Sequence, residues 1–553
     1  MEHARIFIAI VLSFLIFILW EVFFVDRGDL ERLPRETHTT EQETEDKTPR
    51  DFTFQIEEEL KKSMDEQIHG IEDYEIRATI IDTPLYTVSI SEKGATFQSF
   101  TLKNYRESVD ENAPLKELIS KEIGNGSLQC SFQNNSIQGL NDAIFVSKAA
   151  GETIRVYNQT ETITYQWLSP EGVIFEKEYI FSPDTYLITM VVRVKNSSER
   201  DIVDQLKVTL VNQMEPGTTY YGFVGPSGLI DGKVHKVKLG DIKKEPVNSG
   251  RIKWVGLETI YFMNSIVPKE VKNAEMLLQD AGGRIVYNSY REPLINMEKG
   301  SVSTFEYDVF FGPKNMRLLS QMNNGLDKSI NFGMFDFIAK PCLWLMNFIH
   351  DYIPNYGIAI ILLTFVVKII LWPLGNKSYK SMNEMKKLAP LMNEIKEKYK
   401  DDKKKVNQEV MGLYKTYKVN PLGGCLPMVL QIPVFFALYR MLYEAIELRH
   451  APFVLWINDL SAPDRLFNLD IYIPLMQPPY GIPVLTLIMG ASMFLQQKMA
   501  PAPVDPTQAK LMMFMPILFT FIFINFSSGL VLYWLVNNLL SMGQQYYVSQ
   551  KKG

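Results

Sequence analysis

The 553-residue chain is poor in the residues that most often carry chemistry. Its three cysteines are scattered and odd in number, and its six histidines are dispersed without metal-ligand spacing. We therefore expect no disulfide framework and no metal site. A GxxxxGK[ST] phosphate loop and an HExxH motif are also absent, which argues against a nucleotide-driven machine and a zinc protease. We predict no catalytic residue, no cofactor and no enzymatic activity.

The net charge of −6 gives no overall attraction to nucleic acid, so DNA is not an expected partner. Positive charge is instead concentrated in one segment, residues 376–420, which is rich in lysine. Such density marks the cytoplasmic side of a membrane protein. The same lysines also suit a contact with anionic lipid or ribosomal RNA, and the sequence leaves both interpretations open.

The N-terminal segment is apolar from Ile6 to Val25, with only Ser13 and Glu21 as interruptions. No small-residue cleavage site follows it, so residues 1–25 are predicted to form an uncleaved signal anchor; a cleaved signal is the alternative. Residues 26–55 are charged and almost free of apolar side chains, which predicts a disordered tether.

Residues 56–330 follow a period of two. In the segment 185–195, Ile188, Met190, Val192 and Val194 fall on one face, as in a half-buried strand. Further strands are predicted at Leu85–Ile90, Ile154–Tyr157, Val173–Phe181 and Ser303–Phe311. No strong helical segment interrupts them, so we expect a large antiparallel β-sandwich without a catalytic site.

The remaining segments are apolar. Residues 331–356 are predicted to include an amphipathic interfacial helix near Phe335–Ile353, because polar residues interrupt it too often for a span. About five spans of nearly membrane-crossing length follow. They are predicted at Gly357–Leu374, Gly424–Ile446, Ile482–Lys498, Leu511–Phe526 and Gly529–Tyr546.

The lysine-rich segment 376–420 lies between two of these spans and carries apolar residues at alternating spacings of three and four. We predict a cytoplasmic helical hairpin with a break at Asp401-Asp402 and a kink or late start at Pro390. Counting outward places both termini in the cytoplasm and the β region outside. The basic tail, residues 550–553, agrees with this topology.

Polar residues inside the predicted spans suggest a role beyond anchoring. Lys368 either snorkels to the headgroups or faces a water-filled cavity. The span with Gln431 also carries Pro433, which a plain anchor avoids. Asn525, Asn537 and Asn538 either join helices through hydrogen bonds or line a hydrophilic groove with Lys368.

Three segments carry a resemblance to a known family. They are NPLGGCLPMVLQIPVFFALYRML (420–442), ELRHAPFVLWINDLSAPD (447–464) and SGLVLYWLVNNLLSMGQQ (528–545). The chain resembles the YidC-type membrane protein insertases of Gram-negative bacteria, within the YidC/Oxa/Alb family. The resemblance implies a multi-pass inner-membrane protein of about six transmembrane helices. It also implies a five-helix insertase core, residues 357–549, and an all-β periplasmic supersandwich.

The resemblance further implies that the chain inserts and folds nascent membrane-protein clients, alone or with the Sec translocon. It also implies contacts with membrane lipids and, through the lysines of the hairpin, with ribosomes. Thr364 and Lys368 match the family's groove-facing threonine and positive charge, and Tyr533 and Trp534 match its aromatic client contacts. With Gln431, these form our predicted groove. The family usually has arginine at the position of Lys368, and many relatives have a longer basic tail.

Two other function classes use similar features. A small-solute transporter also carries polar groups within its spans, but such proteins typically contain inverted repeats, and the sequence contains none that we recognise. A carbohydrate- or partner-binding β domain with a membrane anchor would need one span rather than several.

Overall fold

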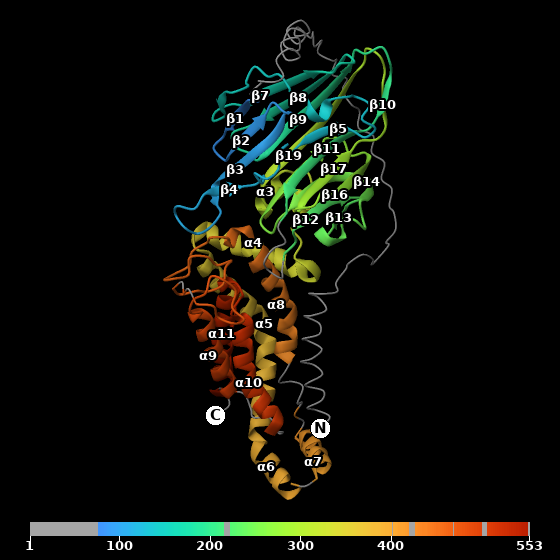
Figure 1. Cartoon of the computed structure of the whole chain (residues 1–553). Helices are drawn as coiled ribbons and strands as arrows, with labels where there is room; N and C mark the ends of the chain where they lie inside the picture. Colours follow the sequence, from blue (N-terminus) through green and yellow to red (C-terminus); the bar gives the residue numbers. More distant parts are fainter. Residues whose placement is uncertain are drawn as a thin grey trace.

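The computed structural model describes residues 76–214, 222–400, 402–417, 419, 426–467, 469, 471–499 and 506–550. The predicted signal anchor and tether, the start of the β region, residues 420–425 and residues 551–553 lie outside the described residues. Strands fill the described chain from Ala78 to Pro313, and long helices follow. In Figure 1 the β-rich part lies above a bundle of helices.

The β region consists mainly of a five-stranded and a twelve-stranded sheet. The smaller sheet has the order β4-β3-β2-β1-β6 and is antiparallel apart from the parallel pair β1–β6. Its strands are β1 (Ala78–Asp82), β2 (Tyr86–Ser91), β3 (Thr96–Arg106), β4 (Leu115–Glu117) and β6 (Thr153–Arg155).

The larger sheet has the path β5-β11-β17-β16-β14-β15-β19-β9-β8-β7, with β12 pairing with β14 and β13. Its strands are β5 (Gln129–Phe132), β7 (Glu161–Leu168), β8 (Val173–Phe181), β9 (Leu187–Asn196), β11 (Leu206–Gln213), β12 (Gly225–Ile230), β13 (Lys233–Lys236), β14 (Val247–Glu258), β15 (Phe262–Pro268), β16 (Asn273–Asp280), β17 (Ile285–Arg291) and β19 (Val302–Pro313). A short pair joins β10 (Ile202–Asp204) and β18 (Ile295–Met297). The five strands predicted from period two correspond to β2, β6, β8, β9 and β19.

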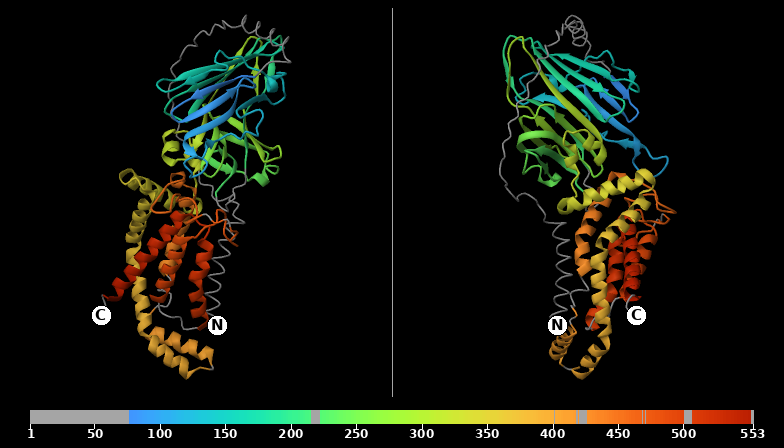
Figure 2. Two further views of the ribbon diagram at one scale, coloured as in Figure 1. Left: turned by 60° about the vertical axis from the view of Figure 1, so that its left-hand side comes forward. Right: turned by 180° about the vertical axis from the view of Figure 1, so that it is seen from behind.

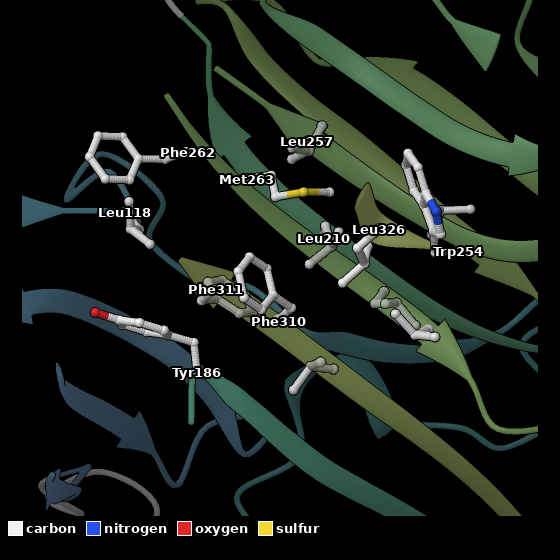
Figure 3. Packing of buried hydrophobic residues seen from close by; sticks show 14 of the residues in the cluster. Leu118, Tyr186, Leu210, Trp254, Leu257, Phe262, Met263, Phe310, Phe311 and Leu326 are labelled. Carbon is white, nitrogen blue, oxygen red and sulfur yellow. The ribbon is translucent and has the colours of Figure 1, made fainter. Parts of the chain in front are cut away.

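An aromatic core joins the two sheets. The rings of Phe97 and Phe100 on β3 lie 5.6 and 5.1 Å from that of Phe311 on β19. Figure 3 shows part of this core, with Phe310 and Tyr186 beside Phe311. Burial of such large rings is the main force that stabilises a sandwich, which explains why the alternating pattern was readable in the sequence.

A buried charge network lies at the end of the β region that faces the helices. The Glu258 carboxylate accepts from Lys314 Nζ at 2.8 Å and from Lys236 Nζ at 3.2 Å. Lys236 also donates to the carbonyl of Ser329, at the end of a 3₁₀ turn (Leu326–Ser329). Burial alone would raise the pKa of Glu258, but the two lysines outweigh it and hold the pKa at about 2.

An amphipathic helix, α4 (Asp336–Tyr352), begins the membrane part where the sequence predicted an interfacial helix. It buries Leu343 and Met346, packs on α8 (Leu426–Glu444) and α5 (Tyr356–Lys387), and exposes Trp344, Phe348 and Tyr352. These three rings contact one another in sequence, at 5.5 and 5.1 Å. Figure 2 shows α4 lying across the end of the bundle beneath the β region.

Helices occupy all five predicted spans: α5, α8, α9 (Val484–Met499), α10 (Pro506–Phe523) and α11 (Ser528–Gln550). Within the described residues, α5 is the one helix long and apolar enough to pass a test for crossing a membrane, and Met512–Phe523 is a shorter apolar helix. The number of spans therefore stays a prediction. The helix α5 also continues through Pro373 to Lys387, beyond the end of the predicted span at Leu374.

The hairpin contains α6 (Ala389–Lys398) and α7 (Lys403–Thr416). Pro390 lies in the first turn of α6, where its missing N–H costs nothing. The Asp402 side chain caps α7 by accepting from the Lys405 N–H at 3.0 Å. Tyr414 Oη lies 3.2 Å from Met392 Sδ, which joins the two helices along the predicted apolar seam.

The segment after α8 fastens the helices to the β region. Arg449 donates to the carbonyls of Arg106 and Glu107 at 2.7 and 3.2 Å, and its guanidinium lies 5.4 Å from the centre of the Phe262 ring. The Asn315 amide donates to Glu447 Oε1 at 3.0 Å. The two parts of the molecule are thus joined by specific polar contacts.

The charge network around Glu258 generates a stability prediction. Glu258→Gln leaves two buried ammonium groups without a counter-charge, so we expect a loss in the free energy of unfolding on the order of 3–5 kcal/mol. The measurement is urea unfolding of the full chain followed by tryptophan fluorescence. Because the pKa of Glu258 is lower in the folded state, its stabilisation is complete above pH 4.5 and is lost as pH falls toward about 2.

The matched control is Asp241→Asn, which removes a 2.6 Å ion pair with Lys244 at the surface. Water screens an exposed ion pair, so this variant is expected to unfold almost like the parent. Equal stability of the two variants would contradict the role assigned to Glu258.

Candidate functional site

The helix α11 carries an unusual set of buried polar side chains. Asn538, Ser541, Gln544 and Gln545 are all nearly inaccessible to solvent, although the helix is mostly apolar. Buried polar groups need hydrogen-bond partners, and none can come from hydrocarbon. Figure 1 shows α11 beside both α9 and α5, and these two neighbours supply the partners.

One row of hydrogen bonds joins α11 to α5. Lys368 Nζ donates to Ser541 Oγ at 2.6 Å, and Ser541 Oγ donates to the carbonyl of Asn537 at 2.7 Å. One turn farther on, the Gln544 amide donates to the carbonyl of Trp372 at 3.0 Å and to Asn376 Oδ1 at 2.9 Å. We call this row the polar seam.

The spacing of the seam follows from helix geometry. Positions 368, 372 and 376 on α5 lie four residues apart and share one face, as do 537, 541 and 544 on α11. Both sets run in the same order along the chain, so the two helices pair in parallel. Gly375 allows the close approach, because a Cβ there would lie 2.7 Å from Gln544 Nε2.

The opposite side of α11 is fastened to α9. Asn538 donates to Ser492 Oγ at 3.0 Å, and Gln545 donates to the carbonyl of Met499 at 2.9 Å. Asn538 therefore joins helices, which was one of its two predicted roles. Its neighbour Asn537 supplies the backbone carbonyl that orients Ser541.

The electrostatics of the seam centre on Lys368. Its side chain is half-buried, and within the described residues no carboxylate lies at ion-pair distance from it. An ammonium group has three donors. The Ser541 hydroxyl is the one partner identified among the described side chains, so Lys368 holds a cation without a counter-charge.

Thr364 lies one turn before Lys368 on the same face of α5 and is buried. Its hydroxyl donates to the carbonyl of Ile360, in its own helix, at 2.6 Å. Thr364 thus extends the polar seam toward the N-terminal end of α5, but its hydroxyl proton is already used within the helix.

Aromatic side chains form a second group on α11. The Trp534 ring lies 4.8 Å from Phe435 on α8 and 5.0 Å from Phe523 on α10. The Tyr533 hydroxyl and the Trp534 indole nitrogen are buried without a hydrogen-bond partner among the described residues. Gln431 of α8 is half-buried.

The five predicted groove residues therefore form two groups. Lys368 and Thr364 belong to the polar seam, and Gln431, Tyr533 and Trp534 belong to the aromatic group. Positions 534 and 541 on α11 are about 10 Å apart along the helix axis. Asn525 is separate from both, because it lies in the turn between α10 and α11 and donates to the carbonyl of Leu475.

Ser541, Gln544 and Asn376 were not predicted from the sequence as members of the site. Their signal was present as polar residues at helical spacing in α11 and as the repeat 368, 372, 376 in α5. Pairing them needed the helix packing. Within the described residues, no group of three or more His, Cys, Asp or Glu side chains is placed to hold a metal ion.

Two glycines provide a test of the seam. Gly375→Ala is expected to displace the Gln544 amide and break its two hydrogen bonds, a loss of about 1–3 kcal/mol for a buried polar group. Gly543→Ala on α11 meets open space and gains only the better helix propensity of alanine, up to ~1 kcal/mol. Thermal unfolding in one detergent measures both variants, and an equal gain in Tm would contradict the close contact at Gly375.

Comparisons with known proteins cover nearly the whole chain. Residues 78–345 match the family model described as YidC periplasmic domain, and residues 348–553 match the model described as 60Kd inner membrane protein. The membrane protein insertase YidC of Syntrophus aciditrophicus is 41% identical over 475 residues, which is 85% of this chain and 84% of that protein. The one of Syntrophobacter fumaroxidans is 39% identical over 564 residues, covering 99% of each.

Among solved structures, the chain is similar to an active YidC insertase crystal structure with the first transmembrane domain resolved, at 18% identity and a TM-score of 0.37, covering 89% of this chain and 99% of that one. The family models and the sequence identities decide the assignment. The chain belongs to the YidC family of membrane protein insertases and is not an enzyme.

Proposed function

We propose that this chain inserts and folds integral membrane proteins in the bacterial inner membrane, alone or with the Sec translocon. The polar seam and the aromatic group would line a hydrophilic groove open to the cytoplasm and to lipid. The observation that carries the proposal is the Lys368 cation, held by Ser541 without a counter-charge among the described residues. The family match and the relatives' printed names support the same activity.

The proposed topology keeps the sequence-based boundaries. Residues 1–25 anchor the chain, 26–55 tether it, 56–330 form the periplasmic domain and 331–356 include the interfacial helix. Residues 357–549 form the insertase core, and both termini lie in the cytoplasm. The names of the two family models, inner membrane protein and periplasmic domain, agree with this order.

The energetic problem of insertion lies in the client's polar flank. A client helix gains roughly 25 cal/mol for each Å² of apolar surface that enters lipid. A charge on its flank costs several kcal/mol when it loses its water. Polar groups part of the way across the bilayer shorten the distance that the flank must cross without water. The polar seam from Asn376 to Lys368 provides such groups over about 12 Å of α5.

The positive charge of Lys368 would favour clients whose polar flank carries negative charge. Around a half-buried cation the effective dielectric constant is lower than in water, so its attraction for a carboxylate is stronger. Two ammonium donors remain for a client group while Ser541 keeps its hydrogen bond. The planar guanidinium of the family's usual arginine can bind a carboxylate through two parallel hydrogen bonds. The ammonium of Lys368 is a compact charge, so it would attract a carboxylate without that bidentate geometry.

The aromatic group would receive the client's apolar part. Trp534 is half-buried, has no partner for its indole N–H among the described residues, and is surrounded by rings from α8 and α10. Such a half-buried ring would offer apolar contact to the client. Release toward lipid then needs no further chemistry.

The driving force comes from the client itself. The sequence has no nucleotide-binding loop, so client hydrophobicity supplies the free energy, aided by the membrane potential at ~2.3 kcal/mol per charge per 100 mV. The exposed lysines of the hairpin, among them Lys386, Lys387 and Lys404, suit a ribosome or anionic lipid.

Photocrosslinking tests the function directly. A photoreactive amino acid at position 534 is expected to crosslink to a ribosome-stalled, single-span client in native membranes once its apolar segment emerges. The control position is Leu539 on the same helix, which is exposed and outside the aromatic group. Absence of any client crosslink from position 534 in a folded, membrane-inserted protein would contradict the proposal.

The charge of Lys368 generates a second prediction. Lys368→Ala is expected to slow the insertion of clients with acidic translocated segments by about 5–30-fold, which corresponds to the loss of ~1–2 kcal/mol. Lys368→Arg should retain the rate, because it keeps the charge. In vitro insertion into proteoliposomes gives the rates.

Clients without acidic residues serve as one control, and Ile369→Ala, on the exposed face of α5, serves as the other. Both are expected to leave insertion unchanged. If Lys368→Ala slowed the insertion of acidic and neutral clients equally, this would contradict a role for the charge of Lys368. It would not contradict the insertase activity itself.

A further inference from the structure

The segment between residues 465 and 482 connects the chain after α8 to the start of α9. Its described residues are not helical, and they lie at the end of the bundle where α4 and the β region meet. Figures 1 and 2 both place this part of the chain level with α4. We call it the α8–α9 segment.

The α8–α9 segment exposes large apolar side chains. Phe467, Ile471, Tyr472 and Leu475 are 67%, 66%, 73% and 77% exposed. From residue 466 to 482 the sequence contains one charged residue, Asp470. Soluble surfaces rarely concentrate apolar groups in this way, and such patches mark contacts with a membrane or another molecule.

The backbone holds these side chains outward at a conformational cost. Phe467 and Leu475 have φ values of 60° and 67°, in the left-handed region that residues with bulky side chains avoid. In the neighbouring loop Leu455 has a φ of 58° and is 83% exposed. Strain of this kind persists where the surroundings hold it, and it is typical of functional segments. Neither the strain nor the exposure is favourable in water.

Hydrogen bonds within the protein satisfy part of the backbone of the segment and hold it to its neighbours. The Arg465 guanidinium donates to the carbonyls of Asp464, Ile524 and Pro479 at 2.8, 2.7 and 3.0 Å. Asn525 donates to the carbonyl of Leu475 at 2.7 Å and accepts from the Gln477 N–H at 2.8 Å.

Paired backbone contacts add to this internal network. Leu466 and Ile482 exchange hydrogen bonds of 2.8 and 2.9 Å, and the Leu469 N–H donates to the carbonyl of Tyr480 at 2.8 Å. A loop that enters hydrocarbon must satisfy its backbone polar groups internally. A loop that only faces water has no such requirement.

We propose that the α8–α9 segment is a lipid anchor that inserts Phe467, Ile471, Tyr472 and Leu475 into the leaflet on the β-region side of the membrane. Lipid is the occupant because the segment connects two predicted spans at the level of the interfacial helix α4. Tyr472 and Tyr480, whose rings lie 5.8 Å apart, are of the residue type enriched at membrane interfaces.

The anchor goes beyond the insertase activity and does not depend on it. It gives the bundle a second apolar contact with the same leaflet as the exposed rings of α4. Because Asn525 and Arg465 join the segment to the turn between α10 and α11, lipid contact there fixes the depth of that turn in the membrane.

Spin-label accessibility in proteoliposomes tests the proposal. Tyr472→Cys and Leu475→Cys are labelled in the full chain after Cys130, Cys342 and Cys425 have been replaced by alanine. Leu294→Cys is the matched control, since Leu294 is an apolar residue of the β region with 64% exposure. Circular dichroism melting establishes that each variant is folded.

Labels at 472 and 475 are expected to collide several-fold more often with oxygen, which dissolves in lipid, than with a water-soluble nickel chelate. The label at 294 should show the reverse ratio. Water-like collisions at 472 and 475 would overturn the proposal. Shielding of both labels from oxygen and from nickel would also overturn it, because a protein would then cover the segment.

Discussion

The arrangement of the membrane part depends on one constraint: the polar side chains of α11 must find partners where water is scarce. Asn538 and Gln545 find them on α9, and Ser541 and Gln544 find them on α5. Hydrogen bonds between membrane helices average only about 0.6 kcal/mol each, so they contribute more to register than to stability. They determine which residues of α5 face α11, and therefore where Lys368 lies.

The chain stabilises its buried lysines in different ways. In the β region Lys236 and Lys314 share the Glu258 carboxylate, and Lys177 donates to the backbone carbonyls of Gly94, Ala95 and Leu128. Lys368 has a single hydroxyl as its identified partner. A structural lysine is expected to be fully compensated, because an isolated buried charge is costly. The incomplete compensation of Lys368 is what favours a role in binding over a role in folding.

The sequence predicted those features that depend on local periodicity. Alternation in 185–195 located β9, and apolar length located α5, α8, α9, α10 and α11. The helix α5 extends beyond the predicted span, because Pro373 removes one backbone hydrogen bond without ending a helix that neighbouring helices support. The pairing of Lys368 with Ser541 joins residues 173 positions apart, and no local pattern encodes it. The role of Asn525 was hidden for the same reason.

The two ends of the membrane part share a physical logic. The seam has a cation without a counter-charge, and the α8–α9 segment has apolar side chains without apolar cover, in a strained backbone. Each arrangement costs free energy in an isolated protein surrounded by water. On the two proposals above, each would become favourable when its complement is present, an acidic client group for the first and the acyl chains of the bilayer for the second. On these proposals, lipid and an acidic client would supply the contacts that the described residues leave uncompensated.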